Sequence, residues 1–191
     1  NRINKYMIRK ATQGLANYMI KYNEKEAKER GIIIAHDCRI GSREYALNTA
    51  RVMAANGIKA YIYPDLRSTP ELSFGVRYKG CLAGIVVTAS HNPVEYNGYK
   101  VYGKHGYQII GSELDSILNE QKRFDYFDEI AEDDSNVIML DDEIKNDFLS
   151  KVNSLEPNGI IQEAKSNLHI VYTPLNGTGL KFVSKALADS G

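Results

Sequence analysis

The stretch Val86–Pro93 reads VVTASHNP, and it ends the most apolar segment of the chain. A buried strand is predicted over Leu82–Thr88, because a short apolar run bounded by turn residues is typical of a strand inside a parallel sheet. Pro93 has no amide hydrogen and restricts the backbone of Asn92, so the strand must end before them. Ser90 is therefore expected on an exposed, rigid turn that suits a nucleophile or a covalent carrier. A serine that only satisfies a turn is the alternative.

The rest of the chain alternates between strand patterns and helix patterns. The periodicity predicts helices over Tyr6–Tyr22, Arg43–Asn56, Glu71–Lys79, Ser112–Arg123, Asp141–Leu155 and Thr178–Ala188, with Asn4 and Ser42 as the N-caps of the first two. It predicts further strands over Ile32–Ala35, Ile58–Tyr63, Gly98–Tyr102 and His169–Tyr172. Such alternation predicts an α/β fold with three layers, α/β/α, around a mixed, mostly parallel sheet of about four strands. The connection before Gly98–Tyr102 is too short for a parallel crossover, so that strand is expected to be antiparallel.

The charge balance and the cysteines narrow the function classes. The 191 residues contain 24 Lys and Arg against 24 Asp and Glu, so no general basic field favours nucleic acid or a membrane surface. Cys38 and Cys81 lie far apart without metal-like spacing, as in a protein of a reducing compartment. No signal peptide or membrane span is visible, which makes a cytoplasmic location the expectation. Because residue 1 is asparagine, the natural N-terminus is expected to lie upstream.

Polar side chains follow three of the predicted strands at the point where each strand ends. The first strand runs into His36–Ser42, the second into Arg67–Pro70 and the third into Thr88–Pro93, which Tyr96–Lys100 follows. In open parallel sheets, ligands bind outside the C-terminal ends of the strands. These segments are therefore expected to converge on one site, in which Ser90 is the candidate nucleophile.

Several familiar kinds of site are not supported. Ser90 lacks the G-x-S-x-G elbow, and a histidine directly beside a serine in sequence seldom has the geometry of a triad base. The chain has no G-x-x-x-x-G-K-[ST] loop, which disfavours nucleotide hydrolysis. His36, His105 and His169 form no cluster. The carboxylates of Asp125–Glu143 show no ligand spacing, so a surface loop is preferred there over a metal site.

Thr88–Pro93 (TASHNP), followed by Tyr96–Lys100 (YNGYK), resembles the active-site loop of the α-D-phosphohexomutases, the superfamily of the phosphoglucomutases and phosphomannomutases. Asp37–Ser42 (DCRIGS) also agrees with the family pattern. Ile170–Gly179 (IVYTPLNGTG) is similar to the opening of the family's second domain, in the branch of bacterial phosphoglucomutases and phosphopentomutase-like enzymes. Asn176 departs from the histidine that this branch often has. The likeness extends over nearly the whole chain.

The resemblance implies a four-domain enzyme that interconverts sugar 1-phosphates and 6-phosphates, most simply those of glucose, through a phosphoserine and a bisphosphate. Residues 1–156 would be its first domain and residues 160–191 the truncated start of the second, with a linker at Glu156–Gly159. The implied cofactor is Mg²⁺, held by a phosphate oxygen on Ser90 and by second-domain aspartates outside this chain. The implied partners are a sugar phosphate and domains II–IV. The 191 residues alone are accordingly expected to be inactive.

The resemblance also assigns roles to single residues. Ser90 matches the phosphorylated serine, and Arg39 and Lys100 match positions close to the transferring phosphate, where cations stabilise developing charge and assist proton transfer. His91 would support phosphate binding or the shape of the loop. Thr88, Asn92 and Asn97 are the remaining candidates for binding phosphate or substrate. For two further polar residues, Asp37 and Thr69, a turn-stabilising role is favoured, with Asp37 also able to hold Arg39.

Three alternatives remain open at this point. The first is a non-catalytic domain that binds phosphate or a partner and keeps the loop only as a scaffold. The second is a phosphatase that hydrolyses the phosphoserine. The third is a mutase of the same superfamily that acts on mannose or pentose phosphates.

Overall fold

The computed structural model describes residues 3–155, 165 and 167–190. Residues 1–140 and 141–191 form two separate compact units. The domain boundary predicted at residues 156–160 lies outside the described residues, so it stays a prediction.

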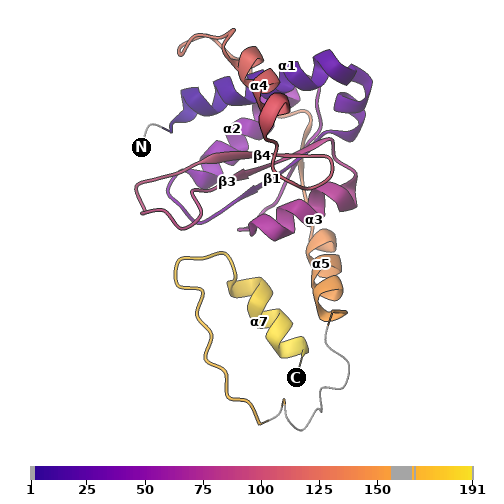
Figure 1. The fold of residues 1–191 in the computed structure, drawn as a ribbon, viewed down its shortest axis with the longest axis vertical. Helices are drawn as coiled ribbons and strands as arrows, with labels where there is room; N and C mark the ends of the chain where they lie inside the picture. The colour runs from indigo at the N-terminus through magenta and orange to yellow at the C-terminus, as the bar shows by residue number, and fades with distance from the viewer. Residues whose placement is uncertain (1–2, 156–164, 166, 191) are drawn as a thin grey trace. The chain divides into compact units, whose positions relative to one another are not determined.

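The first unit is built on one five-stranded sheet (Figure 1). The strands are β1 Ile32–His36, β2 Ala60–Ile62, β3 Ala83–Val87, β4 Tyr99–Gly103 and β5 Val137–Met139, in the order β4-β3-β1-β2-β5. β1 pairs in parallel with β2 and β3, β5 pairs in parallel with β2, and β4 pairs antiparallel with β3. The mixed, mostly parallel sheet and its antiparallel fourth strand are thus confirmed, and the number of strands is one more than expected.

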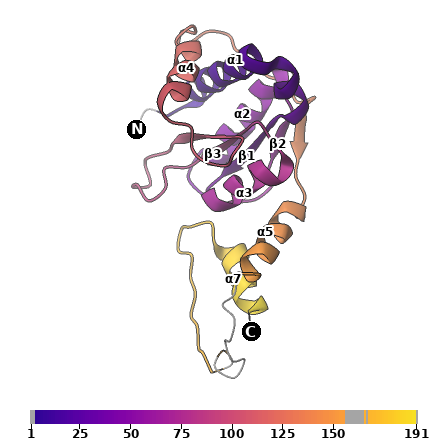
Figure 2. The same ribbon diagram turned by 45° about the vertical axis from the view of Figure 1, so that its right-hand side comes forward.

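Helices cover both faces of the sheet, which gives the three layers. The helices of this unit are α1 Lys5–Arg30, α2 Ser42–Ala55, α3 Thr69–Lys79 and α4 Gly111–Gln121. Two views place α3 on one face of the sheet and α2 on the other face (Figures 1 and 2). Helices α1 and α4 lie on the same side of the sheet as α2, where α1 packs against both α2 and α4. Alternate residues of β1 point to opposite faces of the sheet. Ile32 and Ile34 pack in the core cluster with α1 and α2, and Ile33 lies beside Gly75 of α3.

The helix boundaries follow from local capping. The Asn4 side chain accepts a hydrogen bond from the Met7 amide at 3.0 Å, which confirms the predicted N-cap of α1. α1 extends beyond Tyr22 through a kink at Asn23, whose side chain caps the following turn through the Glu26 amide. The N-cap predicted for α2 is wrong by one residue, because Gly41 holds that position and the Ser42 hydroxyl is bound to a neighbouring carboxylate instead.

Two parts of the sequence pattern gave a wrong expectation. β5 arises within the acidic stretch that was expected to be a surface loop, because its short Val-Ile-Met run pairs with the free edge of β2. His169–Tyr172 was expected to form a strand, but no strand is found among the described residues of that stretch. A strand needs a paired neighbour, and apolar alternation alone does not supply one.

The second unit contains α5 Glu143–Asn153 and α7 Leu180–Asp189. Phe148 and Phe182 stack with their ring centroids 4.8 Å apart, which joins the two helices. No helix among residues 3–155 and 167–190 has both the length and the apolar character needed to cross a lipid bilayer.

Gly84 of β3 provides a test of the packing between the sheet and α3. A Cβ at this position would lie 2.4 Å from Val76 Cγ2 and 3.4 Å from Leu72 Cδ1, both in α3 and both fully buried. We expect Gly84→Ala to lower the free energy of unfolding by about 1–3 kcal/mol through this overpacking, as measured by urea denaturation. Gly103→Ala, whose Cβ would be 3.5 Å from Ile109, is the matched strand control and should leave stability nearly unchanged. Equal stabilities of the two variants would contradict the packing described here.

Candidate functional site

The predicted site lies at the C-terminal ends of β1 and β3, which are neighbours in the sheet. Their last residues, His36 and Val87, are register partners. The chain leaves β1 toward β2 on one side and leaves β3 toward β4 on the other, so the loops after these two strands diverge from a topological switch point. Crevices at such points are where open α/β sheets bind ligands. The loop after β2 is tied to the same edge, because the Arg67 amide donates to the His36 carbonyl at 3.1 Å.

Asp37 is the hub that joins the loop after β1 to the loop after β3. Its Oδ1 accepts hydrogen bonds from Ser42 Oγ at 2.6 Å and from the Arg39 amide at 3.0 Å. Its Oδ2 accepts from Thr88 Oγ1 at 2.5 Å and lies 3.3 Å from Arg39 Nε. The Asp37 side chain is 12% exposed, so this carboxylate is compensated by hydroxyls, an amide and a guanidinium in place of water. The expectation that Asp37 holds Arg39 agrees with this geometry.

The Arg39 side chain crosses from the first loop to the backbone of the second. Its Nη1 donates to the carbonyls of Pro93 at 2.7 Å and Tyr96 at 2.9 Å. Its Nη2 donates to the carbonyls of Ser90 at 2.8 Å and Asn92 at 2.5 Å. Together with Nε, which faces Asp37, every nitrogen of the guanidinium is engaged within the protein. The family resemblance implies a place for Arg39 near the transferring phosphate, but nothing in the sequence indicates these four carbonyl partners.

Ser90 lies on the exposed turn that the sequence predicted. Its φ of +57° is in the left-handed region, which costs a residue with a Cβ about 1–2 kcal/mol. The turn is held from both sides, because the Ser90 amide donates to Thr88 Oγ1 at 2.9 Å and the Ser90 carbonyl accepts from Arg39. The Oγ atom remains exposed, with His91 Nδ1 3.4 Å away. The backbone is therefore fixed while the hydroxyl stays accessible.

The other predicted binding residues have different surroundings. Thr88 is buried, and its hydroxyl links Asp37 to the Ser90 amide. The Asn97 side chain donates to Ser42 Oγ at 2.8 Å and accepts from the Gly98 amide, which is the pattern of a structural brace. Asn92 is exposed and contributes its backbone carbonyl to the loop.

Lys100 lies on β4 opposite Val86, so its side chain shares a face of the sheet with Val86 and, two residues further along, with Thr88. Diagonal neighbours of this kind lie roughly 7–8 Å apart, within reach of a lysine side chain. Lys100 is half-buried, and its ammonium group has no hydrogen bond or ion pair with any of the described residues. Lys100 is therefore an unpaired cation, among the described residues, on the strand that pairs with the strand leading into the Ser90 turn.

Ser42 is a site residue that is absent from the predicted candidates. The sequence pattern indicates a helix cap and the last residue of a family-like segment, without a role at the site, yet the buried Ser42 hydroxyl donates to Asp37 and accepts from Asn97. Thr69 begins α3 and has no hydrogen bond to the Asp37 network within the described residues. The spacing D-x-R-x-x-S was the available signal for Ser42, because it places three polar side chains on one tight loop.

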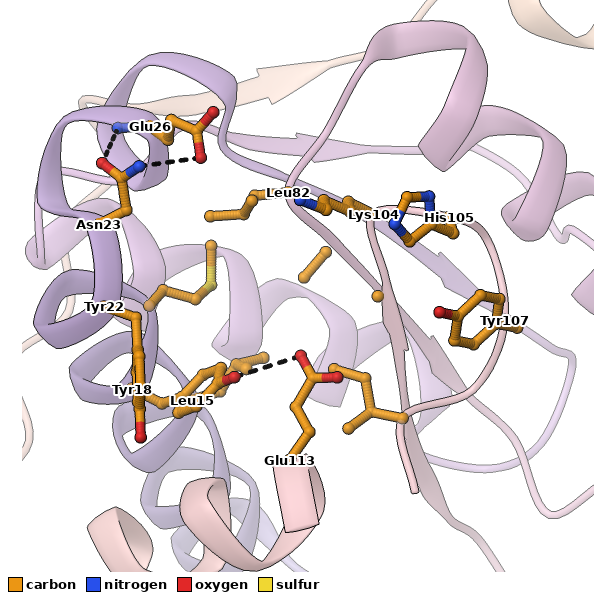
Figure 3. Close-up of a pocket in the computed structure, with 14 residues that line it drawn as sticks. Leu15, Tyr18, Tyr22, Asn23, Glu26, Leu82, Lys104, His105, Tyr107 and Glu113 are labelled. Carbon is orange, nitrogen blue, oxygen red and sulfur yellow. Dashed lines mark hydrogen bonds between the residues drawn. The ribbon is translucent and has the colours of Figure 1, made fainter. Parts of the chain in front are cut away.

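Two of the hollows on this unit differ in their position relative to the predicted site. One, of about 560 Å³, adjoins the loop after β1 and is lined by residues that include His36, Asp37, Arg39, Leu47 and Leu66. The other, of about 350 Å³, lies at the opposite edge of the sheet, beside the end of β4 (Figure 3). Figure 3 shows its tyrosines, Tyr18, Tyr22 and Tyr107, around the opening, and Tyr18 donates to Glu113 at 3.3 Å. This second hollow contains His105 but none of the site residues that the sequence predicted.

Side chains of the metal-ligating types are dispersed over the part of the chain that the structure describes. No group of three or more His, Cys, Asp or Glu side chains converges within residues 3–155 and 167–190. Both carboxylate oxygens of Asp37 are already engaged by Ser42, Thr88 and Arg39. A divalent ion at the Ser90 turn would therefore need ligands other than these.

Comparisons with known proteins agree with this architecture. Residues 1–126 match the family described as phosphoglucomutase/phosphomannomutase, alpha/beta/alpha domain I. A relative from Haemophilus influenzae named "Probable phosphomannomutase" is 36% identical over 99% of this chain and 38% of its own length. A "Phosphoglucomutase" from Staphylococcus haemolyticus is 34% identical over 97% of this chain and 34% of its own length.

The fold is also found among solved structures. The crystal structure of a "putative phosphomannomutase" from Thermus thermophilus superposes with a TM-score of 0.79 at 20% identity, over 98% of this chain and 40% of the other. The chain thus spans roughly a third of the length of the curated relatives it matches. The match over residues 1–126 is nevertheless more than half of the chain. This chain belongs to the phosphoglucomutase/phosphomannomutase family.

Proposed function

We propose that this chain carries the first domain of a phosphosugar mutase, and that Ser90 Oγ carries the phosphoryl group. In the forward half-reaction a sugar hydroxyl oxygen attacks phosphorus as the Oγ–P bond breaks; a sugar bisphosphate forms, and the hydroxyl proton ends on Ser90 Oγ. In the return half-reaction Ser90 Oγ attacks the other phosphorus as its bond to the sugar oxygen breaks, and the serine proton ends on that sugar oxygen. The net change moves the phosphate from one sugar oxygen to another and consumes no co-reactant.

The observation that supports this proposal most is the fixed, exposed turn at Ser90. Phosphoryl transfer depends on positioning and on charge neutralisation. The turn supplies the first, because its backbone is held by Thr88 and Arg39 while the Oγ stays open. Lys100 supplies positive charge for a phosphoserine that carries about −1.5 to −2 charge at pH 7.

The sugar and the cofactor belong to the same proposal. The names of the relatives cover three sugars, since one relative from Schizosaccharomyces pombe, 34% identical over 97% of this chain, is a "Probable phosphoribomutase". We propose glucose 1-phosphate and 6-phosphate as the pair. Mg²⁺ and the need for domains II–IV remain expectations of the resemblance for the complete protein. The cytoplasmic location remains an expectation of the sequence pattern.

The proposal is tested on the complete protein that carries this chain, expressed from its full gene. Phosphopeptide mapping is expected to find phosphate on Ser90 and none on Ser116, a half-buried serine of α4 whose Oγ donates to the Ser112 carbonyl. Conversion of glucose 1-phosphate is expected to exceed that of mannose 1-phosphate and ribose 1-phosphate. Absence of phosphate on Ser90, together with no isomerisation of any of the three, would leave the non-catalytic alternative. Faster conversion of mannose or ribose phosphate would overturn only the choice of glucose.

A further inference from the structure

The feature that carries a further inference is the group of four backbone carbonyls gathered around one guanidinium. The carbonyls of Ser90, Asn92, Pro93 and Tyr96 all accept from Arg39, which lies more than fifty residues earlier in the chain. Four carbonyl dipoles that point at one position repel one another unless a donor group satisfies them. The shape of the Ser90 turn therefore depends on a side chain from the other loop.

We propose that Arg39 is a positioning residue that sets the Ser90 turn, and that it does not bind the transferring phosphate. A guanidinium has five N–H donors and no acceptor. In Arg39 four donors serve the carbonyls and the fifth, on Nε, faces Asp37 Oδ2 at 3.3 Å. No donor is left for a phosphate oxygen, and the charge is already paired with a carboxylate. This inference rests on the proposed role of Ser90.

The contacts explain why the residue is an arginine. Its planar fork delivers two donors from each terminal nitrogen, which matches carbonyls on two sides of the loop. A lysine would have only three donors at a single point. Asp37 fixes the fork by its contact with Nε, and through Thr88 it also holds the Ser90 amide. One carboxylate thereby aligns both the amide side and the carbonyl side of the turn.

This arrangement also accounts for the left-handed backbone of Ser90. A residue with a Cβ adopts positive φ only where the surroundings impose it. Here the amide of Ser90 is held by Thr88 and its carbonyl by Arg39, so both peptide groups of the residue are fixed. Without the guanidinium, the carbonyl would turn toward water and the Oγ would lose its orientation.

The test uses Arg39→Lys and Arg39→Ala in the complete protein. Arg43→Lys is the matched control, because Arg43 is an exposed arginine of the adjoining first turn of α2 whose guanidinium has no hydrogen bond or ion pair among the described residues. The first measurement is amide hydrogen exchange at residues 90–96, with the β1 amides as an internal reference for folding. The second is the separate effect on kcat and on KM for the sugar phosphate. The third is the reaction rate of Arg39→Ala with added guanidinium ion, with methylammonium ion as the control cation.

The proposal expects both Arg39 variants to exchange the loop amides at least about tenfold faster while β1 stays protected. It expects kcat to fall about 100-fold, the usual cost of a small misplacement, with KM changed by less than about threefold. Guanidinium ion should restore part of the rate, and methylammonium should not. A phosphate-binding role would instead raise KM, leave the loop exchange unchanged and let Arg39→Lys retain most activity, and that pattern would overturn the proposal.

The outcome is distinguishable from a failure of the proposed function. Amide exchange at residues 90–96 reports on the Arg39 clamp, meaning the hydrogen bonds from Arg39 to the four loop carbonyls, and it does not depend on catalysis. It can therefore be measured even if no sugar phosphate is converted. If the β1 amides of Arg39→Ala also lose their protection from exchange, this variant is unfolded, and the test is made on Arg39→Lys instead. Protected loop amides in Arg39→Lys would then refute the clamp. Full activity of a variant without the Ser90 hydroxyl would refute the carrier role of Ser90 and leave the exchange result standing.

Discussion

Replacing Ser90 with alanine is expected to lower mutase activity of the complete protein by at least about 1,000-fold, the scale of losing a covalent nucleophile. The change removes the one oxygen that the proposed reaction alternately bonds to phosphorus, and no neighbouring hydroxyl has the same exposure on this turn. Thr88, the nearest alternative, is buried with its hydroxyl engaged by Asp37. The measurement is the initial rate of glucose 1-phosphate conversion, together with the mass of the purified protein, which should lose its phosphate.

Two companion variants separate the chemistry from the backbone. Ser90→Gly is expected to be as inactive as Ser90→Ala but more stable, by about 1 kcal/mol, because glycine adopts the left-handed backbone without strain. Ser116→Ala, which removes a hydroxyl that donates to the Ser112 carbonyl elsewhere in this unit, should be fully active. Near-normal activity in Ser90→Ala would refute the carrier role, whatever the stability of the variants.

The fold was largely predictable because its central strands have a clear sequence pattern. Ile32–Ala35 and Leu82–Thr88 are short apolar runs closed by polar turns, and each forms a strand buried on both faces. The antiparallel β4 followed from the length of its connection alone. In these cases local pattern and tertiary environment agree, which is the condition under which sequence reading succeeds.

The failures share one physical cause, since they depend on pairing partners far away in the chain. Val137–Met139 becomes a strand only because β2 offers a free edge, and nothing in the surrounding acidic sequence shows that edge. His169–Tyr172 has the opposite problem, with a strand-like pattern and no paired neighbour among the described residues. Local periodicity cannot supply either fact.

The site follows the same division. Ser90 could be found from the sequence, because Pro93 and the end of an apolar run fix where the turn must be. The carbonyl partners of Arg39 and the Asn97 partner of Ser42 could not be found, because they lie on the loop after β3, about fifty residues away. A motif indicates which residues matter, whereas the hydrogen bonds indicate which of them face the ligand and which hold the loop.

Lys100→Ala is expected to lower kcat/KM for the sugar phosphate by about 100- to 1,000-fold, the cost of removing one group that stabilises transition-state charge. The reason is the contrast with Arg39. The Arg39 donors are engaged by the protein. Lys100 is a half-buried residue whose ammonium has no partner among the described residues, and its register places it on the face of the sheet that carries Thr88. A partly buried cation without a counter-ion is unfavourable by itself. A dianionic phosphate on Ser90 would compensate it.

The matched control for Lys100 is Lys104→Ala, because Lys104 is an exposed lysine just beyond the far end of the same strand. It should keep normal activity, since it lies by the opposite edge of the sheet from the Ser90 turn. Lys100→Arg should retain more activity than Lys100→Ala, because it preserves the charge. If Lys100→Ala and Lys104→Ala were equally active, the positive charge needed at the turn would have to come from another residue. The proposed role of Lys100 at the phosphate would then be wrong. The proposed role of Arg39 in holding the loop would be unaffected, because amide exchange tests it separately.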